Sequence, residues 1–349
     1  MTRAQRKRDH IQYALSTGQN RRTGLDDITF VHQSLPDTAL EEISIQTKIG
    51  GLSLGSPIFI NAMTGGGGRE TERINGELAL AAKEAGVAMA VGSQMSALKN
   101  QEERRSFKVV RKLYGDGIIL ANLGSEATVE QAEAAVEMVE ANALQIHLNV
   151  IQELTMPEGD RSFKGAVERI GLIADKLPVP VIVKETGFGL GREAIKKLAA
   201  LPVAAVDVSG FGGTNFAAVE NKRRKKRLDY FNSWGIPTAA AIVECKTAVD
   251  QLDVIASGGL QNSLDVAKSL ALGAAAAGMA GSLLSVLMEN GAEALAAELS
   301  SLHEDLKLIM CAVGAKKVTD LHKVPLILSG ETFHWLHIRG CDPAALAQR

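Results

Sequence analysis

The chain has 349 residues, of which 46% are hydrophobic and 4% aromatic, with 34 glycines and a formal net charge of −2. The near-neutral charge excludes a general electrostatic attraction to nucleic acid or to a membrane surface, and no run approaches the ~18 apolar residues of a membrane span. Three scattered cysteines without a CxxC pair exclude a disulfide framework or a cysteine-rich zinc site. Together with an N-terminus that lacks an apolar signal core, these features predict a soluble cytoplasmic protein.

Taken in chain order, residues 57–290 alternate short β-rich runs with longer segments of helical spacing. The eight expected strands are Ile58–Met63, Val87–Gly92, Gly117–Leu123, Leu144–Val150, Val179–Lys184, Val203–Ser209, Val254–Ser257 and Ala274–Met279. Expected helices between them include Val129–Glu140, Arg192–Leu201 and Asn262–Leu272. Eight βα units in roughly 230 residues favour an α/β fold, the (β/α)8 TIM barrel, over the alternative of a doubly wound sheet.

This pattern places residues 1–349 in a single domain. The barrel core is expected at about 57–290, after an N-terminal extension of 1–56 and before a C-terminal helical extension of 291–349. Helical spacing at Glu293–Ile309 supports the second extension, whereas residues after about Leu328 show no clear pattern. Active sites of such barrels lie at the C-terminal ends of the strands, so polar residues there are the candidates.

The most informative strand end lies at residues 145–153. Because strand side chains alternate, Gln145, His147 and Asn149 share one face. Gln152 and Glu153 are expected in the loop that follows. An imidazole, several amides and a carboxylate thus meet at the end of one strand. The alternative is a polar strand end whose groups are satisfied by their neighbours.

Glycine-rich segments follow the last two expected strands. Gly258 and Gly259 follow the seventh strand, and Ala280 and Gly281 follow the eighth and open a helix. Glycines let backbone N–H groups approach a phosphate, and a helix N-terminus favours an anion. Because phosphate sites after these two strands recur in barrels, we predict one here. The alternative is that the glycines only form tight turns.

Lys184 is a candidate of a different kind. It follows the apolar run Val179–Val183 at the end of the fifth expected strand, and buried lysines are rare unless they are paired or functional. Its functional interpretations are a Schiff-base nucleophile or a cation that stabilises a reduced flavin. A structural ion pair with Asp207 is the alternative.

Six consecutive basic residues occupy positions 222–227. No aromatic residues interleave with them, so we interpret the run as a solvated loop or lid that helps to attract an anionic substrate. A non-enzymatic binding protein that uses this run is the alternative.

Short motifs spread over the chain resemble those of one family. In order, they are Arg6-Lys7 with His10, Ala62-Met63-Thr64-Gly65-Gly66, Gly92-Ser93-Gln94, His147-Leu148-Asn149 with Gln152-Glu153, Lys184-Glu185, Ser209-Gly210 with Gly212-Gly213-Thr214, and Ser257-Gly258-Gly259. Over about residues 3–330 the chain resembles the type 2 isopentenyl-diphosphate isomerases, which are FMN-dependent. The resemblance implies a TIM barrel, bound FMN, Mg²⁺, reduction by NADPH, and a homotetramer or homo-octamer.

The resemblance also implies a role for each matching residue. The FMN-binding positions are Ala62, Met63, Thr64, Ser93, Asn122, Lys184, Ser209, Thr214, Gly258, Gly259, Ala280 and Gly281. The substrate-binding positions are Arg6, Lys7, His10, Ser93, Gln94, His147, Asn149 and Gln152. Glu153 matches the Mg²⁺ ligand, and the catalytic candidates are Gln152, His147 and Lys184. Met95 and Phe216 depart from the pattern, since many relatives carry Arg at the first position and some carry Trp at the second.

The implied activity interconverts isopentenyl and dimethylallyl diphosphate in isoprenoid biosynthesis. A reduced flavin is the preferred acid–base for this proton transfer, with Gln152 assisting it. The N-terminal segment is expected to close over the substrate as a clamp. The alternative is an FMN-dependent oxidoreductase of the 2-hydroxy-acid oxidase type. The loop after the sixth strand, Phe211–Thr214, lacks the His/Arg pair that such chemistry needs.

Overall fold

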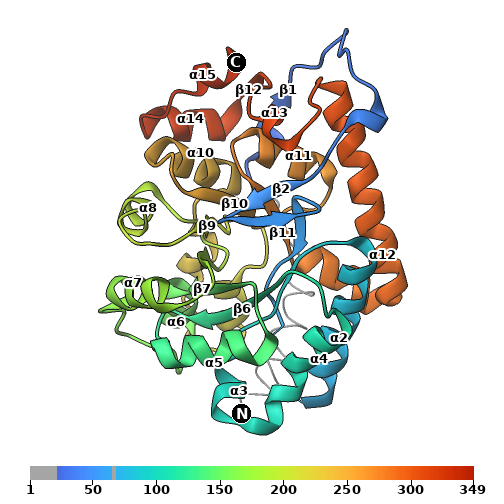
Figure 1. Cartoon of the computed structure of the whole chain (residues 1–349). Helices are drawn as coiled ribbons and strands as arrows, with labels where there is room; N and C mark the ends of the chain where they lie inside the picture. Colours follow the sequence, from blue (N-terminus) through green and yellow to red (C-terminus); the bar gives the residue numbers. More distant parts are fainter. Residues whose placement is uncertain (1–21, 65–67) are drawn as a thin grey trace.

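A closed barrel of eight parallel strands forms the centre of the protein (Figure 1). The computed structural model describes residues 22–64 and 68–349. The barrel strands are β4 (Ile58–Ile60), β5 (Met89–Ala90), β6 (Ile119–Gly124), β7 (Ala143–Leu148), β8 (Val181–Glu185), β9 (Ala205–Asp207), β10 (Asp253–Ser257) and β11 (Ala276–Met279). The other strands are β1 (Ile28–Phe30), β2 (Thr47–Ile49), β3 (Leu52–Leu54) and β12 (Leu326–Leu328). Pairing of β11 with β4 closes the ring, which confirms the predicted TIM barrel and excludes an open, doubly wound sheet.

Several barrel strands end earlier than predicted because polar side chains bind the backbone at their C-terminal ends. β4 stops at Ile60, and the Ala62 N–H then donates to the side chain of Asn61. β9 stops at Asp207, whose carboxylate accepts the Ser209 N–H at 3.1 Å. Ser209 itself has a φ of 35°, which lies outside the β region. These residues therefore belong to loops at the rim of the barrel.

Helices surround the barrel (Figure 1). They are α2 (Gly68–Ala85), α3 (Met95–Lys99), α4 (Arg105–Leu113), α5 (Val129–Val139), α6 (Val150–Thr155), α7 (Ala166–Lys176), α8 (Arg192–Leu198), α9 (Phe216–Asn221), α10 (Thr238–Ala248), α11 (Ser263–Ala271), α12 (Gly281–Ala312), α13 (Val318–Leu321), α14 (Gly330–Ile338) and α15 (Pro343–Ala347). The three predicted helices are confirmed as α5, α8 and α11, although each ends before its predicted end. In α5 the cause is Glu140, whose φ of 46° stops the helix. Among the described helices, none combines the length and apolar content needed to cross a bilayer.

Apolar side chains fill the N-terminal end of the barrel interior. Phe59, Ile182 and Ile255 are at most 1% exposed there, and the β2–β3 hairpin adds further apolar side chains. The hairpin is fixed to the barrel because the Gly50 N–H donates to the Asp253 carboxylate at 2.8 Å. A ligand can therefore occupy only the opposite, C-terminal end of the barrel.

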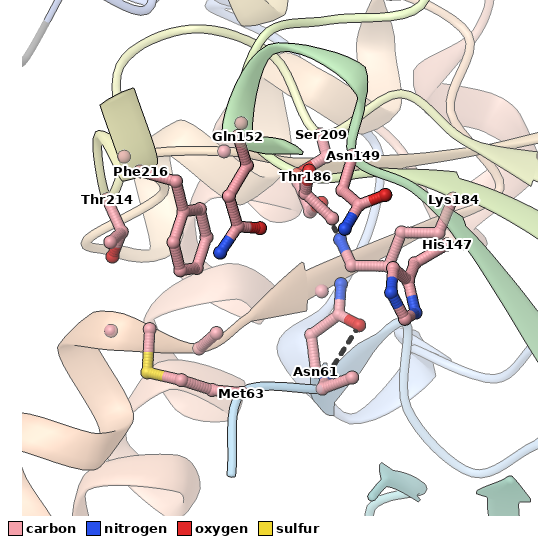
Figure 2. A pocket seen from close by; sticks show the side chains of 18 of the residues that line it. Asn61, Met63, His147, Asn149, Gln152, Lys184, Thr186, Ser209, Thr214 and Phe216 are labelled. Atoms are coloured by element: carbon pink, nitrogen blue, oxygen red, sulfur yellow. Dashed lines mark hydrogen bonds between the residues drawn. The ribbon is translucent and has the colours of Figure 1, made fainter. Parts of the chain in front are cut away.

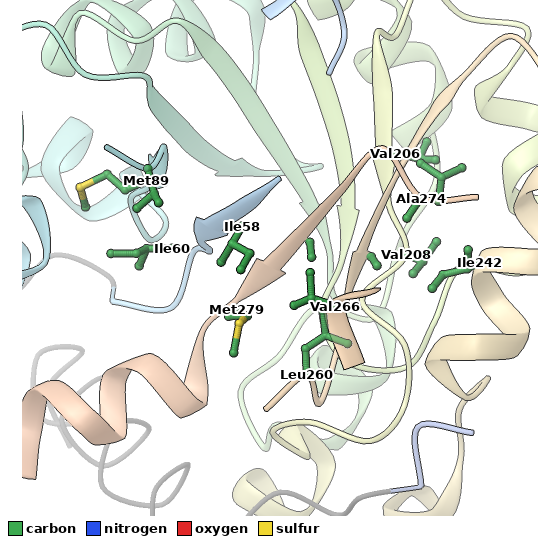
Figure 3. Close-up of a cluster of buried hydrophobic side chains, with 14 of the residues drawn as sticks. Ile58, Ile60, Met89, Val206, Val208, Ile242, Leu260, Val266, Ala274 and Met279 are labelled. Atoms are coloured by element: carbon green, nitrogen blue, oxygen red, sulfur yellow. The ribbon is translucent and has the colours of Figure 1, made fainter. Parts of the chain in front are cut away.

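A larger core lies between the strands and the helices that cover them. Figure 3 shows part of it, with Val206 and Val208 among the same buried side chains as Ile242 of α10 and Val266 of α11. All four side chains are fully buried. Close packing of this kind holds the loops at the strand ends in place, since protein interiors leave little room for adjustment.

The two ends of the described chain meet. β1 pairs antiparallel with β12, so that Ile28 lies opposite Leu328. The predicted helix Glu293–Ile309 lies within the longer α12, which is interrupted at Gly291, where φ is 86°. α14 and α15 belong to the region after Leu328 in which the sequence shows no clear pattern, and β12 lies just before it. Residues 291–349 are therefore mostly helical but also supply the strand β12.

Candidate active site

The C-terminal strand ends surround a cavity of about 260 Å³ (Figure 2). The predicted site residues that line it are Ala62, Met63, Ser93, Asn122, His147, Asn149, Gln152, Glu153, Lys184, Ser209, Thr214, Gly258, Gly259, Ala280 and Gly281. Thr214 and Phe216 lie toward one side of the view, and His147 and Lys184 toward the other. The fold thus brings together residues from every part of the barrel sequence.

Two predicted site residues do not line this cavity. Gln94 is fully buried; its amide donates to the carbonyl of Ala135 at 2.9 Å and accepts the N–H of Asn122 at 3.0 Å. Thr64 is also buried and donates to the side chain of Asn75. Both side chains are therefore buried behind the cavity wall and make their hydrogen bonds within the protein. Arg6, Lys7 and His10 lie outside the described residues.

Gln152 and Glu153 lie in the short helix α6, and the prediction that they lie in a loop was wrong. The helix begins directly after β7 because the Asn149 carbonyl accepts the Glu153 N–H at 2.9 Å. The Asn149 side chain also donates to Glu153 Oε1 at 2.9 Å. Residues three and four positions apart share a helix face, so the first turn presents Asn149, Gln152 and Glu153 to the cavity together.

Glu153 is half-buried, and its burial raises the pKa of the carboxyl group. The N–H of Asp160 donates to its second oxygen at 2.8 Å. A second carboxylate, Glu126, also lines the cavity and raises the pKa of Glu153 further by repulsion. Within the described part of the chain, no three acidic, histidine or cysteine side chains form a ready metal cage. A metal ion held by Glu153 therefore needs additional ligands from substrate or water.

The sequence analysis missed a buried acid behind Gln152. Glu220 on α9 is fully buried, and its carboxylate lies 3.5 Å from the Gln152 amide nitrogen. Arg223 forms an ion pair with Glu220 and another with Glu158. Glu220 follows a predicted loop at no recognisable strand end, and its neighbours Val219 and Asn221 give no local signal of a site.

The sequence predicts a solvated loop or lid at 222–227, but only part of this basic run is exposed to solvent. The Arg223 side chain is only 10% exposed, and Arg224 donates to the carbonyl of Thr155 at 2.8 Å. Lys225, Lys226 and Arg227 are exposed. Arg223 and Arg224 thus fasten α9 to α6 and the loop after it, and the other residues of the run, Lys222 included, form a solvated positive surface.

Lys184 both lines the cavity and forms the ion pair that was the alternative interpretation. Its ammonium group donates to Asp207 at 3.1 Å and to the Ser257 hydroxyl at 3.2 Å. Asp207 is fully buried, so a cation beside it is required to offset the cost of its charge. Asn61 also donates to Asp207, at 2.7 Å. The ion pair holds the ammonium at the floor of the cavity.

The glycines for which a phosphate site was predicted lie at one end of the cavity, beside the start of α12. Gly258 and Gly259 have φ angles of 101° and 83°, values that residues other than glycine rarely adopt. α12 begins at Gly281, and no side chain caps its N-terminus. The first N–H groups of this long helix, which face the cavity side, are available to an anion. A phosphate group together with a buried lysine suits a flavin mononucleotide.

Comparison with known proteins decides the family. Residues 99–327 match the model of the FMN-dependent dehydrogenase family. An isopentenyl-diphosphate delta-isomerase of Bacillus pumilus is 58% identical over 342 residues, covering 98% of this chain and 96% of that protein. One of Bacillus thuringiensis subsp. konkukian is 60% identical over 349 residues, covering both chains completely. This chain belongs to the isopentenyl-diphosphate delta-isomerase family. The FMN-dependent model identifies its class as type 2 and supports FMN as the cofactor.

Solved structures agree with the fold of this isomerase family member. A mandelate oxidase with (S)-mandelic acid has a TM-score of 0.68 at 17% identity, covering 93% of this chain and 97% of that one. A lactate oxidase of Pediococcus acidilactici has the same TM-score and identity, with coverage of 91% and 87%. Identity at this level establishes a shared barrel and nothing about a shared substrate.

Two positions that depart from the family pattern have different settings. Met95 is 4% exposed at the start of α3 and packs into the core, so it offers no contact to a ligand. Phe216 begins α9 and lines the cavity, and Asn215 caps this helix by accepting the N–H of Ala218 at 3.0 Å. In this isomerase family member the first departure lies in the core and the second in the cavity wall.

Proposed function

We propose that this protein interconverts isopentenyl diphosphate and dimethylallyl diphosphate, with reduced FMN and Mg²⁺, in isoprenoid biosynthesis. The composition of the cavity carries the proposal. Glycines and a helix N-terminus lie at one end, a buried lysine lies at the floor, and His147, Asn149, Gln152 and Glu153 lie together at the wall. Relatives that are 58% and 60% identical bear the name of this enzyme.

In this proposal Gly258, Gly259 and Gly281 hold the FMN phosphate through their backbone N–H groups, and Lys184 lies against the ring system. When bound, reduced FMN would supply an electron-rich ring suited to stabilising developing positive charge and to acid–base chemistry. The Lys184 ammonium favours the anionic, reduced form of the cofactor, because opposite charges attract strongly in a buried site.

His147 and Asn149 are proposed to bind the diphosphate, together with Mg²⁺ on Glu153. Mg²⁺ prefers oxygen ligands, is commonly held by one or two carboxylates, and retains several waters, so Glu153 and diphosphate oxygens form a suitable set. Gln152 is proposed to assist proton transfer at the five-carbon tail. Met63 and Phe216 line the same cavity and exclude water from that tail.

The test is an anaerobic assay with isopentenyl diphosphate, FMN, Mg²⁺ and a reductant. Formation of dimethylallyl diphosphate that requires both FMN and Mg²⁺ is expected. An FMN-loaded protein that forms no dimethylallyl diphosphate under these conditions would overturn the proposal.

The oxidase alternative predicts a different result. The cavity lining within the described residues contains no arginine, which a 2-hydroxy-acid oxidase needs to bind the substrate carboxylate. Adding lactate or mandelate to the oxidised, FMN-loaded protein without oxygen should therefore leave the flavin absorption unchanged. Bleaching by either acid would favour the oxidase.

We further propose NADPH as the physiological reductant, a cytoplasmic location, and a homotetramer or homo-octamer without a nucleic-acid partner. Light scattering on the FMN-loaded protein measures the oligomer. The rate of anaerobic flavin reduction by NADPH, compared with NADH, measures the preference for reductant.

Glu153→Gln is expected to raise the Mg²⁺ concentration needed for half-maximal turnover about tenfold or more while leaving FMN affinity unchanged. Glu126→Gln is the matched control, because Glu126 lines the same cavity without an assigned metal role. Since burial raises the pKa of Glu153, protons should compete with Mg²⁺ from a higher pH than at an exposed carboxylate. Equal Mg²⁺ titrations of wild type and Glu153→Gln would remove Glu153 as the ligand.

Deleting residues 1–10 is expected to raise the KM for the diphosphate strongly and to spare FMN affinity. The described chain reaches the rim at Thr23, whose carbonyl accepts the Ala239 N–H at 2.9 Å and whose Cα lies 3.0 Å from an added Cβ at Gly212. Arg6 and Lys7 lie outside the described residues and carry the charge that a diphosphate needs. Arg6→Ala with Lys7→Ala keeps the length and should raise KM similarly. Unchanged KM and kcat in both variants would show that the segment is only a tail.

A further inference from the structure

A chain of hydrogen bonds runs behind the cavity, from Asp207 to His147. Asn61 donates to Asp207 at 2.7 Å, and Gln145 donates to the Asn61 oxygen at 3.2 Å. Asn122 donates to the Gln145 oxygen at 3.3 Å, and Asn122 Oδ1 lies 2.9 Å from His147 Nδ1. Gln145 and Asp207 are both fully buried and do not line the cavity. The chain thus connects five barrel residues on four strands or strand ends.

The direction of this chain is fixed at its Asp207 end. The Asp207 carboxylate accepts hydrogen bonds from four donors: Lys184, the Ser257 hydroxyl, the Ser209 N–H and Asn61. A backbone N–H can only donate, and the Ala62 N–H donates to Asn61 Oδ1 at 2.8 Å. The amide of Asn61 therefore has one possible orientation, with its nitrogen toward Asp207 and its oxygen toward Gln145.

The same logic applies to each following amide. Because Asn61 presents an oxygen, Gln145 must present its nitrogen to Asn61 and its oxygen to Asn122. Asn122 must then present its nitrogen to Gln145 and its oxygen to His147. An amide oxygen has no proton to donate, so the bond to His147 forms only when Nδ1 carries the proton.

We propose that Gln145, oriented by Asn61 and Asp207, is a positioning residue that holds the proton of His147 on Nδ1. The neutral ring then carries its lone pair on Nε2, and any proton that His147 gains is added at Nε2 while the Nδ1 proton stays in place. The tautomer assignment stands on the geometry alone. A diphosphate oxygen can accept a hydrogen bond at Nε2 only after Nε2 has gained its proton, and this use of His147 rests on the proposed function.

Substitutions at Gln145 separate this role from simple packing. Gln145→Met keeps the size of the side chain and removes both hydrogen bonds, so Asn122 is free to turn and His147 should occupy both tautomers. Gln145→Glu is the matched control, because either carboxyl form still offers an oxygen to Asn122. In this control His147 should keep its proton on Nδ1.

Solid-state ¹⁵N spectra of the FMN-loaded, histidine-labelled protein measure the tautomer directly. Subtracting the spectrum of the same protein with His147→Gln isolates His147 among the seven histidines. Wild type and Gln145→Glu should show a protonated Nδ1 and an unprotonated Nε2. Gln145→Met should add a second set of signals, from His147 with the proton on Nε2. The readout needs no turnover, so a failure of the proposed isomerase reaction would leave it interpretable.

Two outcomes would overturn the proposal. One is a wild-type His147 with its proton on Nε2. The other is a Gln145→Met spectrum identical to that of wild type, which would mean that Asn122 alone sets the tautomer. Should Gln145→Met fail to fold, Asn61→Leu breaks the chain one step earlier, and it should produce the same second set of signals; its absence would count equally against the proposal.

Discussion

Lys184→Ala is expected to reduce turnover by about 100-fold or more and to weaken FMN retention, since a preorganised charge at the reacting centre is worth roughly this much. The structure also predicts a loss of stability. Asp207 is fully buried and would lose its cation, and breaking such a pair typically costs about 3–5 kcal/mol. Turnover, bound flavin per chain and the melting temperature are the three measurements.

A double variant separates these effects. Lys184→Ala with Asp207→Asn removes both charges, so most of the stability should return while turnover stays low. Recovery of turnover in the double variant would show that Lys184 serves only to neutralise Asp207. Wild-type activity and flavin occupancy in Lys184→Ala would remove Lys184 from the site altogether.

Gly258→Ala is expected to abolish FMN retention and to lower the free energy of unfolding by about 2–6 kcal/mol, from backbone strain and overpacking together. Its φ is 101°, and an added Cβ would lie 2.0 Å from the carbonyl oxygen of Gly210. The loops after β9 and β10 would have to separate, and the phosphate-binding end of the cavity would be lost.

Gly51→Ala provides the control for backbone strain. Gly51 also has a positive φ, of 87°, but an added Cβ there has no neighbour within 4 Å. It lies in the β2–β3 hairpin, at the end of the barrel remote from the rim. This variant should lose only the smaller strain contribution and keep its FMN. Equal flavin retention in both variants would contradict the assigned role of the Gly258 loop.

Much of the fold was predictable because a barrel repeats a simple pattern. Most buried strands read as short apolar runs, and the covering helices have apolar residues at helical spacing. The ends of these elements were not predictable from periodicity. Asp207 and Asn61 end their strands through bonds between side chains and backbone, and Glu140 ends its helix through a left-handed backbone. Such events depend on single residues and leave the surrounding pattern unchanged.

The site was predictable where a strand end marked it and unpredictable where a partner came from elsewhere in the chain. His147 and Lys184 follow apolar runs and were found as candidates. Gln145 lies in the same strand as His147, and Asp207 ends the strand after that of Lys184, yet their importance lies in contacts with residues far away in the sequence. Glu220 meets Gln152 across 68 positions. No local pattern records such a contact, because the fold alone creates it.

The pairing of β1 with β12 has a consequence for the order in which the molecule assembles. Leu328 follows Ile28 by 300 positions. The first strand to leave the ribosome, β1, therefore cannot pair until the last strand, β12, has been synthesised. Asp27 is held in the same way, because it accepts N–H groups from Ser329 and Thr332. All eight barrel strands precede residue 326, so the cavity can close before β12 exists. Asp27 and β1 therefore reach their final positions only after synthesis of the chain is nearly complete.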